Sequence, residues 1–311
     1  MANIGYIQVT RNCNQNCKFC SNPPNRNSLP FSKIIKFIDD FIERKYQGVI
    51  LTGGEPTLFE DLDKVITYCV KKNFPVRIIT NAQKLSDADY LKKLRDSGLE
   101  DLHISIYSCR EKIQSFLTEN PSSLSNIKKA LNNIRRFDSL RVNINIVINK
   151  YNSDHLSLVV KWICKNYPFV SHFVFNNLDP LMNRTMENPD TIPQLVDFEL
   201  ELDEAMHFLY SQNKTFRVER VPLCYMASFP QYSTETRKIV KQEERVVHFL
   251  DSKRTVHQKR WFYEKARCCE YCSVNSICAG LYQGNRFYSF SHLYPLFIDA
   301  QEVKDKILNP E

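Results

Sequence analysis

Short β-rich runs alternate with longer segments whose apolar residues recur at helical spacing through the first two thirds of the chain. The expected strands are Ile7–Thr10, Gly48–Thr52, Val76–Thr80, Leu102–Tyr107, Val142–Ile148 and His172–Phe175. The expected helices are Phe31–Arg44, Leu58–Lys72, Ser86–Ser97, Ser122–Phe137, Ser153–Tyr167 and Ile192–Gln212. Parallel neighbouring strands need crossovers of this length. The pattern therefore predicts an α/β fold, a partial (β/α)6 barrel of the TIM type that ends near residue 215.

The alternation is lost in residues 216–311, which we expect to form a small hairpin and loop region, either a second domain or a lid on the barrel. The predicted elements there are a strand at Phe216–Val221, a hairpin of Arg245–Phe249 with Arg254–His257 around Asp251-Ser252-Lys253, and a short helix within Phe297–Leu308. Asn183–Pro193, rich in Asn, Thr and Pro, is predicted to be an exposed connection before the last barrel helix.

Composition narrows the class of protein. Hydrophobic residues make up 43% of the 311 residues, but none of the apolar runs is long enough to span a membrane, and no secretion signal is recognisable at the start. We therefore expect a cytoplasmic protein with no membrane association. The net charge of +7 is spread along the chain, so nucleic acid is not excluded as a partner. Eleven cysteines in a reducing compartment indicate metal or redox chemistry more than disulfides.

Three of the cysteines, Cys13, Cys17 and Cys20, lie directly after the first expected strand. In an α/β barrel, the loops at the carboxyl ends of the strands form the catalytic face. Three thiolates so close together suit a soft metal. A tetrahedral structural zinc needs a fourth ligand, whereas a four-iron cluster held by three cysteines leaves one iron open. A structural zinc site and incidental cysteines remain the alternatives.

A second motif, Gly53-Gly54-Glu55-Pro56, ends the second expected strand. Paired glycines allow a backbone to approach a ligand closely or to adopt positive φ, and Glu55 adds a carboxylate at the same edge of the sheet. By itself the segment is typical of a turn. Together with the cysteines on the neighbouring strand, it indicates a binding site.

The spacing Cys-x3-Cys-x2-Cys, with Phe19 before the third cysteine, and the Gly-Gly-Glu-Pro segment resemble the radical S-adenosylmethionine (radical SAM) superfamily over roughly residues 5–215. The resemblance implies a [4Fe-4S] cluster on the three cysteines and S-adenosylmethionine bound to its open iron. It also implies that Gly53 to Pro56 contact the cofactor's methionine amino group. Further contacts with its ribose and carboxylate are implied at later strand ends, where local backbone hydrogen bonds are the alternative: Thr80, Asn81, Ser105, Ser108, Asn149 and Asn152.

The same resemblance implies the reaction. One electron from the cluster cleaves S-adenosylmethionine to methionine and a 5′-deoxyadenosyl radical, which abstracts hydrogen from a substrate. An external electron donor such as flavodoxin or ferredoxin is then expected.

A second cysteine group, Cys269-x2-Cys272-x5-Cys278, resembles the auxiliary-cluster domain called SPASM or its shorter Twitch form. Tyr282 stands where the full pattern has another cysteine, which favours one auxiliary [4Fe-4S] cluster. Its fourth ligand is expected to be Cys224, with Cys268 as the competing candidate. A four-cysteine zinc site is the alternative.

The remaining thiols are assigned by position. Cys224, Cys109 or Cys268, if not a ligand, is a candidate hydrogen-atom donor to a substrate radical. Cys69 and Cys164 fall within helical patterns and are expected in the core. The histidines show no metal-ligand spacing, and no role is assigned to them.

Two classes of substrate follow from the resemblance. The favoured hypothesis is a maturase that acts on a ribosomally made peptide by epimerisation, thioether formation or carbon–carbon crosslinking. The alternative is an enzyme that modifies a small molecule, a nucleoside or a tRNA base. A third reading is a structural metal-binding protein without catalytic activity.

Overall fold

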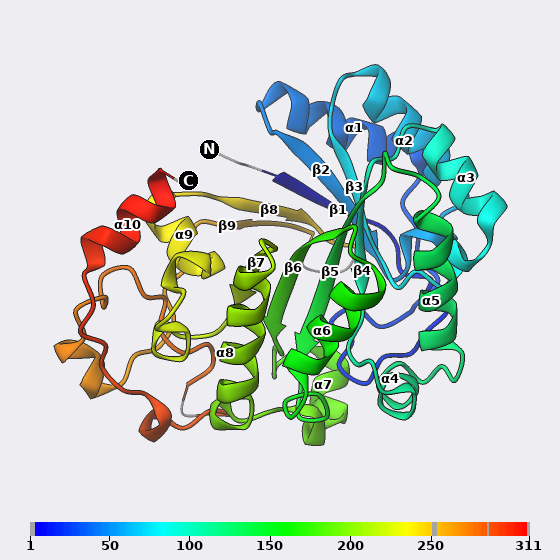
Figure 1. Cartoon of the computed structure of the whole chain (residues 1–311). Helices are drawn as coiled ribbons and strands as arrows, with labels where there is room; N and C mark the ends of the chain where they lie inside the picture. Colours follow the sequence, from blue (N-terminus) through cyan, green and yellow to red (C-terminus); the bar gives the residue numbers. More distant parts are fainter. Residues whose placement is uncertain (1–3, 251–253, 285, 310–311) are drawn as a thin grey trace.

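The computed structural model describes residues 4–250, 254–284 and 286–309, and its central element is a sheet of nine strands (Figure 1). The order across the sheet is β7-β6-β5-β4-β3-β2-β1-β8-β9, and only the β8–β9 pair is antiparallel. The sheet curves without closing, which confirms the predicted partial α/β barrel. The strands are β1 Ile4–Thr10, β2 Gly48–Gly53, β3 Val76–Thr80, β4 Asp101–Ser105, β5 Arg141–Ile148, β6 Val170–Asn177, β7 Thr215–Glu219, β8 Arg245–His248 and β9 Thr255–Gln258.

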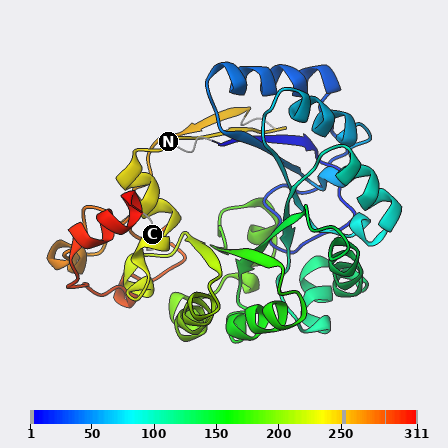
Figure 2. The ribbon, with the colours of Figure 1, turned by 45° about the horizontal axis from the view of Figure 1, so that its top comes forward.

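The helices surround the convex face of the sheet (Figure 2). Amphipathic spacing explains this position: in α1, Ile34, Ile38 and Phe41 recur on one face and are fully buried against the strands. The helices are α1 Phe31–Glu43, α2 Leu62–Lys71, α3 Ala88–Asp96, α4 Glu111–Thr118, α5 Ser123–Ile134, α6 Leu156–Asn166, α7 Asn183–Glu187, α8 Leu195–Ser211, α9 Thr234–Lys241 and α10 Ala300–Leu308.

Three short helices were not predicted. Helix α4 precedes α5 in one crossover, α7 lies inside the segment expected to be an exposed connection, and α9 follows β7. Each has eight residues or fewer, which is too short for a clear helical period. The connection is also less exposed than expected, because Thr185 and Thr191 within it are buried.

The strands of the last third of the chain extend the sheet at both edges. β7 pairs in parallel with β6, and β8 pairs in parallel with β1 at the other side. The predicted hairpin is confirmed by the antiparallel pairing of β8 with β9, while its turn at 251–253 lies outside the described residues. Residues after 215 are therefore joined to the barrel by strand pairing.

Between β7 and β8 the wall of strands is interrupted, and α9 stands in the gap (Figure 2). Across this gap the guanidinium of Arg245 on β8 donates a 2.8 Å hydrogen bond to the carboxylate of Glu219 on β7. Burial opposes ionisation of Glu219, but the adjacent Arg245 lowers its pKa to about 2. The two edges of the open barrel are thus connected by a largely buried ion pair.

Among the described residues, no helix has the length and apolar composition needed to cross a lipid bilayer.

Removing one member of the buried ion pair is expected to lower the free energy of unfolding more than removing one member of an exposed ion pair. We predict that Arg245→Met lowers the free energy of unfolding by about 3 kcal/mol, because Glu219 keeps its charge in a largely buried position. Arg44→Met, which breaks the exposed 3.5 Å pair with Asp40, is the control and is expected to cost less than about 1 kcal/mol. Urea denaturation at neutral pH measures both. Equal losses in the two variants would show that the pair does not hold the barrel edges together.

Candidate functional site

The loop that carries Cys13, Cys17 and Cys20 leaves the carboxyl end of β1 and is attached to helix α4. The backbone N–H of Asn16 donates to the carbonyl of Thr118 at 3.1 Å, and that of Lys18 donates to Leu117 at 2.9 Å. These bonds fix the loop on both sides of Cys17. The three cysteines therefore lie where the sequence predicted them, in the loop at the carboxyl end of the first strand.

Charged side chains hold the outer side of the same loop. Glu119, just after α4, accepts hydrogen bonds from the amide of Asn16 at 2.6 Å and from Arg184 of α7 at 3.0 Å. The ammonium of Lys18 lies 3.4 Å from the same carboxylate. Burial opposes ionisation of Glu119, but these donors and cations lower its pKa.

Helix α7 and the turn after it also bind the backbone of the cysteine loop. The amide of Asn183 donates to the carbonyl of Ser21 at 2.7 Å, and that of Asn188 donates to Lys18 at 3.1 Å. The segment that the sequence indicated only as a connection is therefore part of the support for the cysteines. The two Asn residues of this segment, Asn183 and Asn188, were the available signal.

The three thiols share one partly buried environment. Burial raises the pKa of Cys13 to about 11 and also raises that of Cys17 and Cys20. Proximity contributes as well, because the neighbouring Cys13 and Cys20 thiols raise the pKa of Cys17 further. The sulfur of Cys20 accepts from the backbone N–H of Asn22 at 3.4 Å. Three grouped thiols with an N–H donor fit the ligand set of an iron–sulfur cluster, since metal binding deprotonates the thiols and N–H donors stabilise the bound sulfur.

The Gly53-Gly54 pair is required by the backbone of the cysteine loop. The N–H of Gly54 donates to Thr10 and that of Glu55 to Asn12, both at 2.7 Å. A Cβ atom on Gly53 would lie 2.0 Å from the carbonyl oxygen of Thr10, and one on Gly54 would lie 2.4 Å from that of Asn12. The φ of Gly53 is +147°, which side chains rarely permit. The close approach that the sequence predicted is thus made by the chain itself, and the cofactor contact stays a prediction.

Glu55 connects the ends of β2 and β3 from a position that is 1% exposed. Its carboxylate accepts from the hydroxyls of Thr57 and Thr80 at 2.7 Å each and from the backbone N–H of Asn81 at 2.7 Å. Burial raises the pKa of Glu55, and these donors oppose that shift. The Asn81 amide in turn donates to the sulfur of Cys13 at 3.8 Å. Glu55 therefore positions a side chain that contacts a predicted cluster ligand.

Phe19 lies in a small apolar cluster beneath the loop. Its ring meets that of Tyr107 edge to face, with centroids 4.8 Å apart, and Leu117 and Leu178 complete the cluster. Pro56 is buried at the start of a short 3-10 turn after β2. Both residues support the two loops from inside the protein.

The predicted contacts at later strand ends divide into two groups. Ser105, the last residue of β4, is partly exposed on the inner side of the barrel. Asn149, in contrast, is fully buried, and its amide donates to the carbonyl of Val147 at 3.0 Å. Ser108 and Asn152 are also fully buried, and they connect the segments after β4 and β5, because the Ser108 hydroxyl bonds to His155 and the Asn152 amide donates to the carbonyl of Tyr107. The exposed part of the predicted set is therefore Asn81 and Ser105.

The C-terminal cysteines form a second group that includes Cys224. Burial raises the pKa of Cys224 to about 12, and the nearby thiols of Cys278 and Cys269 add to the shift. Cys278 is close to Cys272 in the same way. The sulfurs of Cys272 and Cys278 accept from the backbone N–H groups of Leu296 and Gly280 at 3.4 Å each. The Cys224 thiol is thus near those of Cys269 and Cys278, and the use of all four thiols as ligands of one cluster stays a prediction.

The thiol of Cys268 also lies beside that of Cys269, whose pKa it helps to raise, but it points to the carbonyl oxygen of Leu293 at 3.5 Å. Cys109 is farther from both groups, and its charged neighbours are Arg110 and Lys128 of α5. Cys69 is fully buried in the core, as expected, and Cys164 is partly buried against it.

The loop after Cys278 reaches the carboxyl end of β6. The hydroxyl of Tyr282 donates to the carboxylate of Asp179 at 2.9 Å, and that of Tyr288 donates to the carbonyl of Leu178 at 3.3 Å. The second cysteine group is therefore attached to the same end of the barrel as the first.

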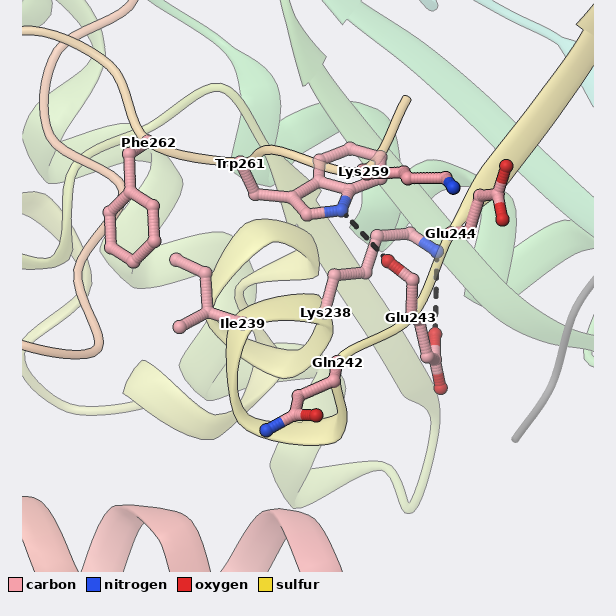
Figure 3. Close-up of a pocket in the computed structure, with 8 residues that line it drawn as sticks. All are labelled: Lys238, Ile239, Gln242, Glu243, Glu244, Lys259, Trp261 and Phe262. Atoms are coloured by element: carbon pink, nitrogen blue, oxygen red, sulfur yellow. Dashed lines mark hydrogen bonds and ion pairs between the residues drawn. The ribbon is translucent and has the colours of Figure 1, made fainter. Parts of the chain in front are cut away.

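A cavity of about 400 Å³ lies between α9 and the segment after β9 (Figure 3). It contains none of the residues predicted from the sequence. Among the described residues, no three His, Cys, Asp or Glu side chains converge closely enough to bind a single metal ion, whereas the cysteines of a four-iron cluster each bind a different iron and stand farther apart. Sequence reasoning also missed basic residues on the inner face of the barrel. Arg217 is one of them, and its position between the buried Phe216 and Val218 was the available signal.

Comparison with known proteins identifies the family. Residues 7–163, half of the chain, match the sequence profile of the radical SAM superfamily. The GTP 3′,8-cyclase of Aliarcobacter butzleri is 32% identical over 178 residues, covering 54% of this chain and 53% of the cyclase. The chain spans about half the length of the curated relatives it matches. It belongs to the radical SAM superfamily, and membership implies a [4Fe-4S] cluster and S-adenosylmethionine.

Solved structures show the same fold. SuiB of Streptococcus suis bound to S-adenosylmethionine superposes with a TM-score of 0.65 at 16% identity, covering 89% of this chain and 72% of SuiB. Native anSMEcpe with bound AdoMet gives a TM-score of 0.63 at 15% identity, covering 99% and 97%. SuiB has also been solved bound to its precursor peptide SuiA, with a TM-score of 0.58 at 20% identity over 69% of this chain and 48% of that chain.

The contact between Gly54 and the cysteine loop leads to a test. We predict that Gly54→Ala displaces the loop at Asn12 and that the purified protein loses most of its iron, at a stability cost of about 1–3 kcal/mol. Gly5→Ala is the matched control, because its Cβ would lie 2.2 Å from the ring of Phe41 in the core and away from the cysteines. Iron analysis and urea denaturation are compared for the two variants. Similar iron content in both at similar stability loss would contradict the role assigned to Gly54.

Proposed function

We propose that this radical SAM enzyme binds its [4Fe-4S] cluster through Cys13, Cys17 and Cys20 and uses S-adenosylmethionine to abstract hydrogen from a substrate inside the barrel. The observation that carries the proposal is the fixed position of three grouped thiols at the carboxyl end of β1. When bound, the reduced cluster supplies the one electron that breaks the carbon–sulfur bond of the cofactor, releasing methionine and the 5′-deoxyadenosyl radical.

The protein's own residues hold the reactants and exclude water. The Glu55 network fixes Asn81, and we propose that Asn81 and Ser105 face the cofactor because both are partly exposed at the carboxyl ends of β3 and β4. The Phe19 cluster closes the site beneath the cysteine loop. The Gly53-Gly54 backbone sets the distance between that loop and β2. Gly53 to Pro56 and the buried Asn149 are proposed to shape the cofactor site from behind.

The second thiol group supports a further proposal, an auxiliary [4Fe-4S] cluster bound by Cys224, Cys269, Cys272 and Cys278. Cys224 is preferred to Cys268 as the fourth ligand, because its thiol lies near those of Cys269 and Cys278. A zinc ion in the same four-thiol set is the alternative. If Cys224 is a cluster ligand, we no longer propose it as a hydrogen-atom donor. External flavodoxin or ferredoxin is proposed to supply the electrons.

Two substrate classes remain candidates. A peptide is supported by the fold shared with SuiB, which binds its precursor peptide, and by the second cysteine group. A small molecule is supported by the sequence relatives named as GTP 3′,8-cyclase, although the similarity covers only about half of each chain. The two likenesses favour different substrates, so the substrate has to be inferred from residues of this chain.

The primary assignment predicts that anaerobically reconstituted protein, reduced with dithionite, releases 5′-deoxyadenosine from S-adenosylmethionine. Cys17→Ala is expected to abolish this release while the fold is retained, because a cluster ligand is missing. Cys164→Ala removes a thiol that lies outside both groups and is expected to react like the wild type. Liquid chromatography with mass spectrometry measures the product. Unchanged release from Cys17→Ala would refute the assignment.

The auxiliary site predicts a difference between two neighbouring thiols. Cys224→Ala is expected to lower the iron content by about four atoms per chain, while Cys268→Ala retains the wild-type content. Both variants are expected to keep the first cluster. Elemental analysis for iron and zinc after reconstitution checks this. A loss in Cys268→Ala alone would make Cys268 the ligand, and zinc in place of iron would make the site structural.

A further inference from the structure

The inner face of the barrel is polar and reached by solvent. Along β4 to β7, the side chains alternate between fully buried ones that face the helices and partly exposed ones that face inward. Strand register places the inward residues in layers. One layer contains Ser105, Asn145, Val174 and Arg217, and the layer beneath it contains His103, Asn143, His172 and Thr215.

Arg217 is the cation in the upper of these layers, and none of the ion pairs in the described part of the chain includes it. The hydrogen bond of its guanidinium runs to the carbonyl of the preceding residue, Phe216, at 3.1 Å. The ring of Tyr232 lies 5.7 Å from its guanidinium carbon. Burial and the nearby Arg237 lower the pKa of Arg217 to about 10, and Glu243 only partly opposes this shift, so a bound anion would stabilise the charged guanidinium.

Other basic side chains surround the same space. Burial, together with the nearby Arg217, His103, Arg77 and Arg237, lowers the pKa of His172 to about 3. Burial and Arg77 lower the pKa of His103 to about 4. Both imidazoles are therefore neutral at physiological pH, and each keeps one N–H that can donate to an anion. The groups come from four strands and from α9.

The charges in this space do not balance. Arg77 lies 3.6 Å from Asp101, but Asp101 is paired more closely with Arg141 at 2.8 Å. Arg237 and Lys238 share Glu243 at 3.9 and 3.3 Å, the latter pair being visible in Figure 3. The Nε of Arg237 is buried without a hydrogen-bond partner. Glu243, which also acts on Arg217, is thus shared among three cations.

We propose that this part of the barrel interior, centred on Arg217 with Arg237 and His172, binds the phosphate or diphosphate group of a small-molecule substrate. A phosphate group carries up to two negative charges and several acceptor oxygens, which suits guanidinium donors. Ser105 lies in the same layer as Arg217, three strands away. The substrate then extends from the phosphate toward the carboxyl ends of the strands, where the cysteine loop lies.

The inference rests on the proposed function for the reaction, but its binding test is independent of it. Inorganic pyrophosphate is titrated calorimetrically into the full-length reconstituted protein without S-adenosylmethionine or reductant. Wild type is expected to bind it, and Arg217→Gln to bind at least about 10-fold more weakly, because a hydrogen bond to a charged group is lost. Arg136→Gln, which removes an exposed charge at the end of α5, is the control and is expected to bind like the wild type.

A second variant and a second probe test the same proposal. Arg237→Gln is a second variant expected to weaken binding if Arg217→Gln does not fold, and circular dichroism monitors the fold of each. Glutarate is the carboxylate probe for an acidic peptide side chain and is expected to bind more weakly than pyrophosphate. The proposal is overturned if both folded variants bind pyrophosphate as tightly as the wild type does. It is also overturned if the wild type binds glutarate more tightly than pyrophosphate, or does not bind pyrophosphate. Failure of 5′-deoxyadenosine release would instead overturn the proposed function and leave the pyrophosphate result standing.

Discussion

The contact between the cysteine loop and the Gly53-Gly54 backbone is the constraint on which the rest of the site depends. The backbone N–H groups of Gly54 and Glu55 donate hydrogen bonds of 2.7 Å to the carbonyls of Thr10 and Asn12, and a side chain on either glycine would clash with these carbonyls. This contact fixes where the loop leaves β1, and Glu55 then transmits the position to β3 through Asn81. Backbone geometry on two neighbouring strands thus sets where the loop begins, and α4 and α7 hold the part of the loop that carries Cys17.

The other side of the barrel is held differently. There the wall of strands is open, and the Glu219–Arg245 pair and α9 occupy the gap. The second cysteine group belongs to the same part of the chain and is attached to β6 by Tyr282 and Tyr288. The basic side chains of Arg217 and Arg237 lie on β7 and α9, the elements beside this gap, where burial makes their charges costly.

The fold and the two cysteine groups were predictable because their signals are local. Strands and long helices follow from residue alternation, and cysteine spacing marks a ligand set whatever the tertiary contacts are. The short helices α4, α7 and α9 were missed because a helix of a few residues depends on what it packs against. The inward direction of Arg217 and His172 was equally hidden, since it depends on strand register. The sequence predicted a close backbone approach at Gly53. The structure shows that the group approached is the backbone of Thr10 in the same chain.

The distribution of charge inside the barrel bears on how a reactive radical would be directed. Under the proposed function, the radical forms near the cysteine loop, where Phe19 and Tyr107 provide apolar contacts beneath the loop and the charged Lys18, Glu119 and Arg184 lie on its outer side. A substrate anchored by charge in the layer of Arg217 would have its anionic end removed from that region. Binding energy used at one end of a molecule can fix the other end at the reacting position. Separating the anchor from the reacting atoms also keeps mobile charged side chains away from the radical. The polar interior and the apolar loop would then act as two halves of one site.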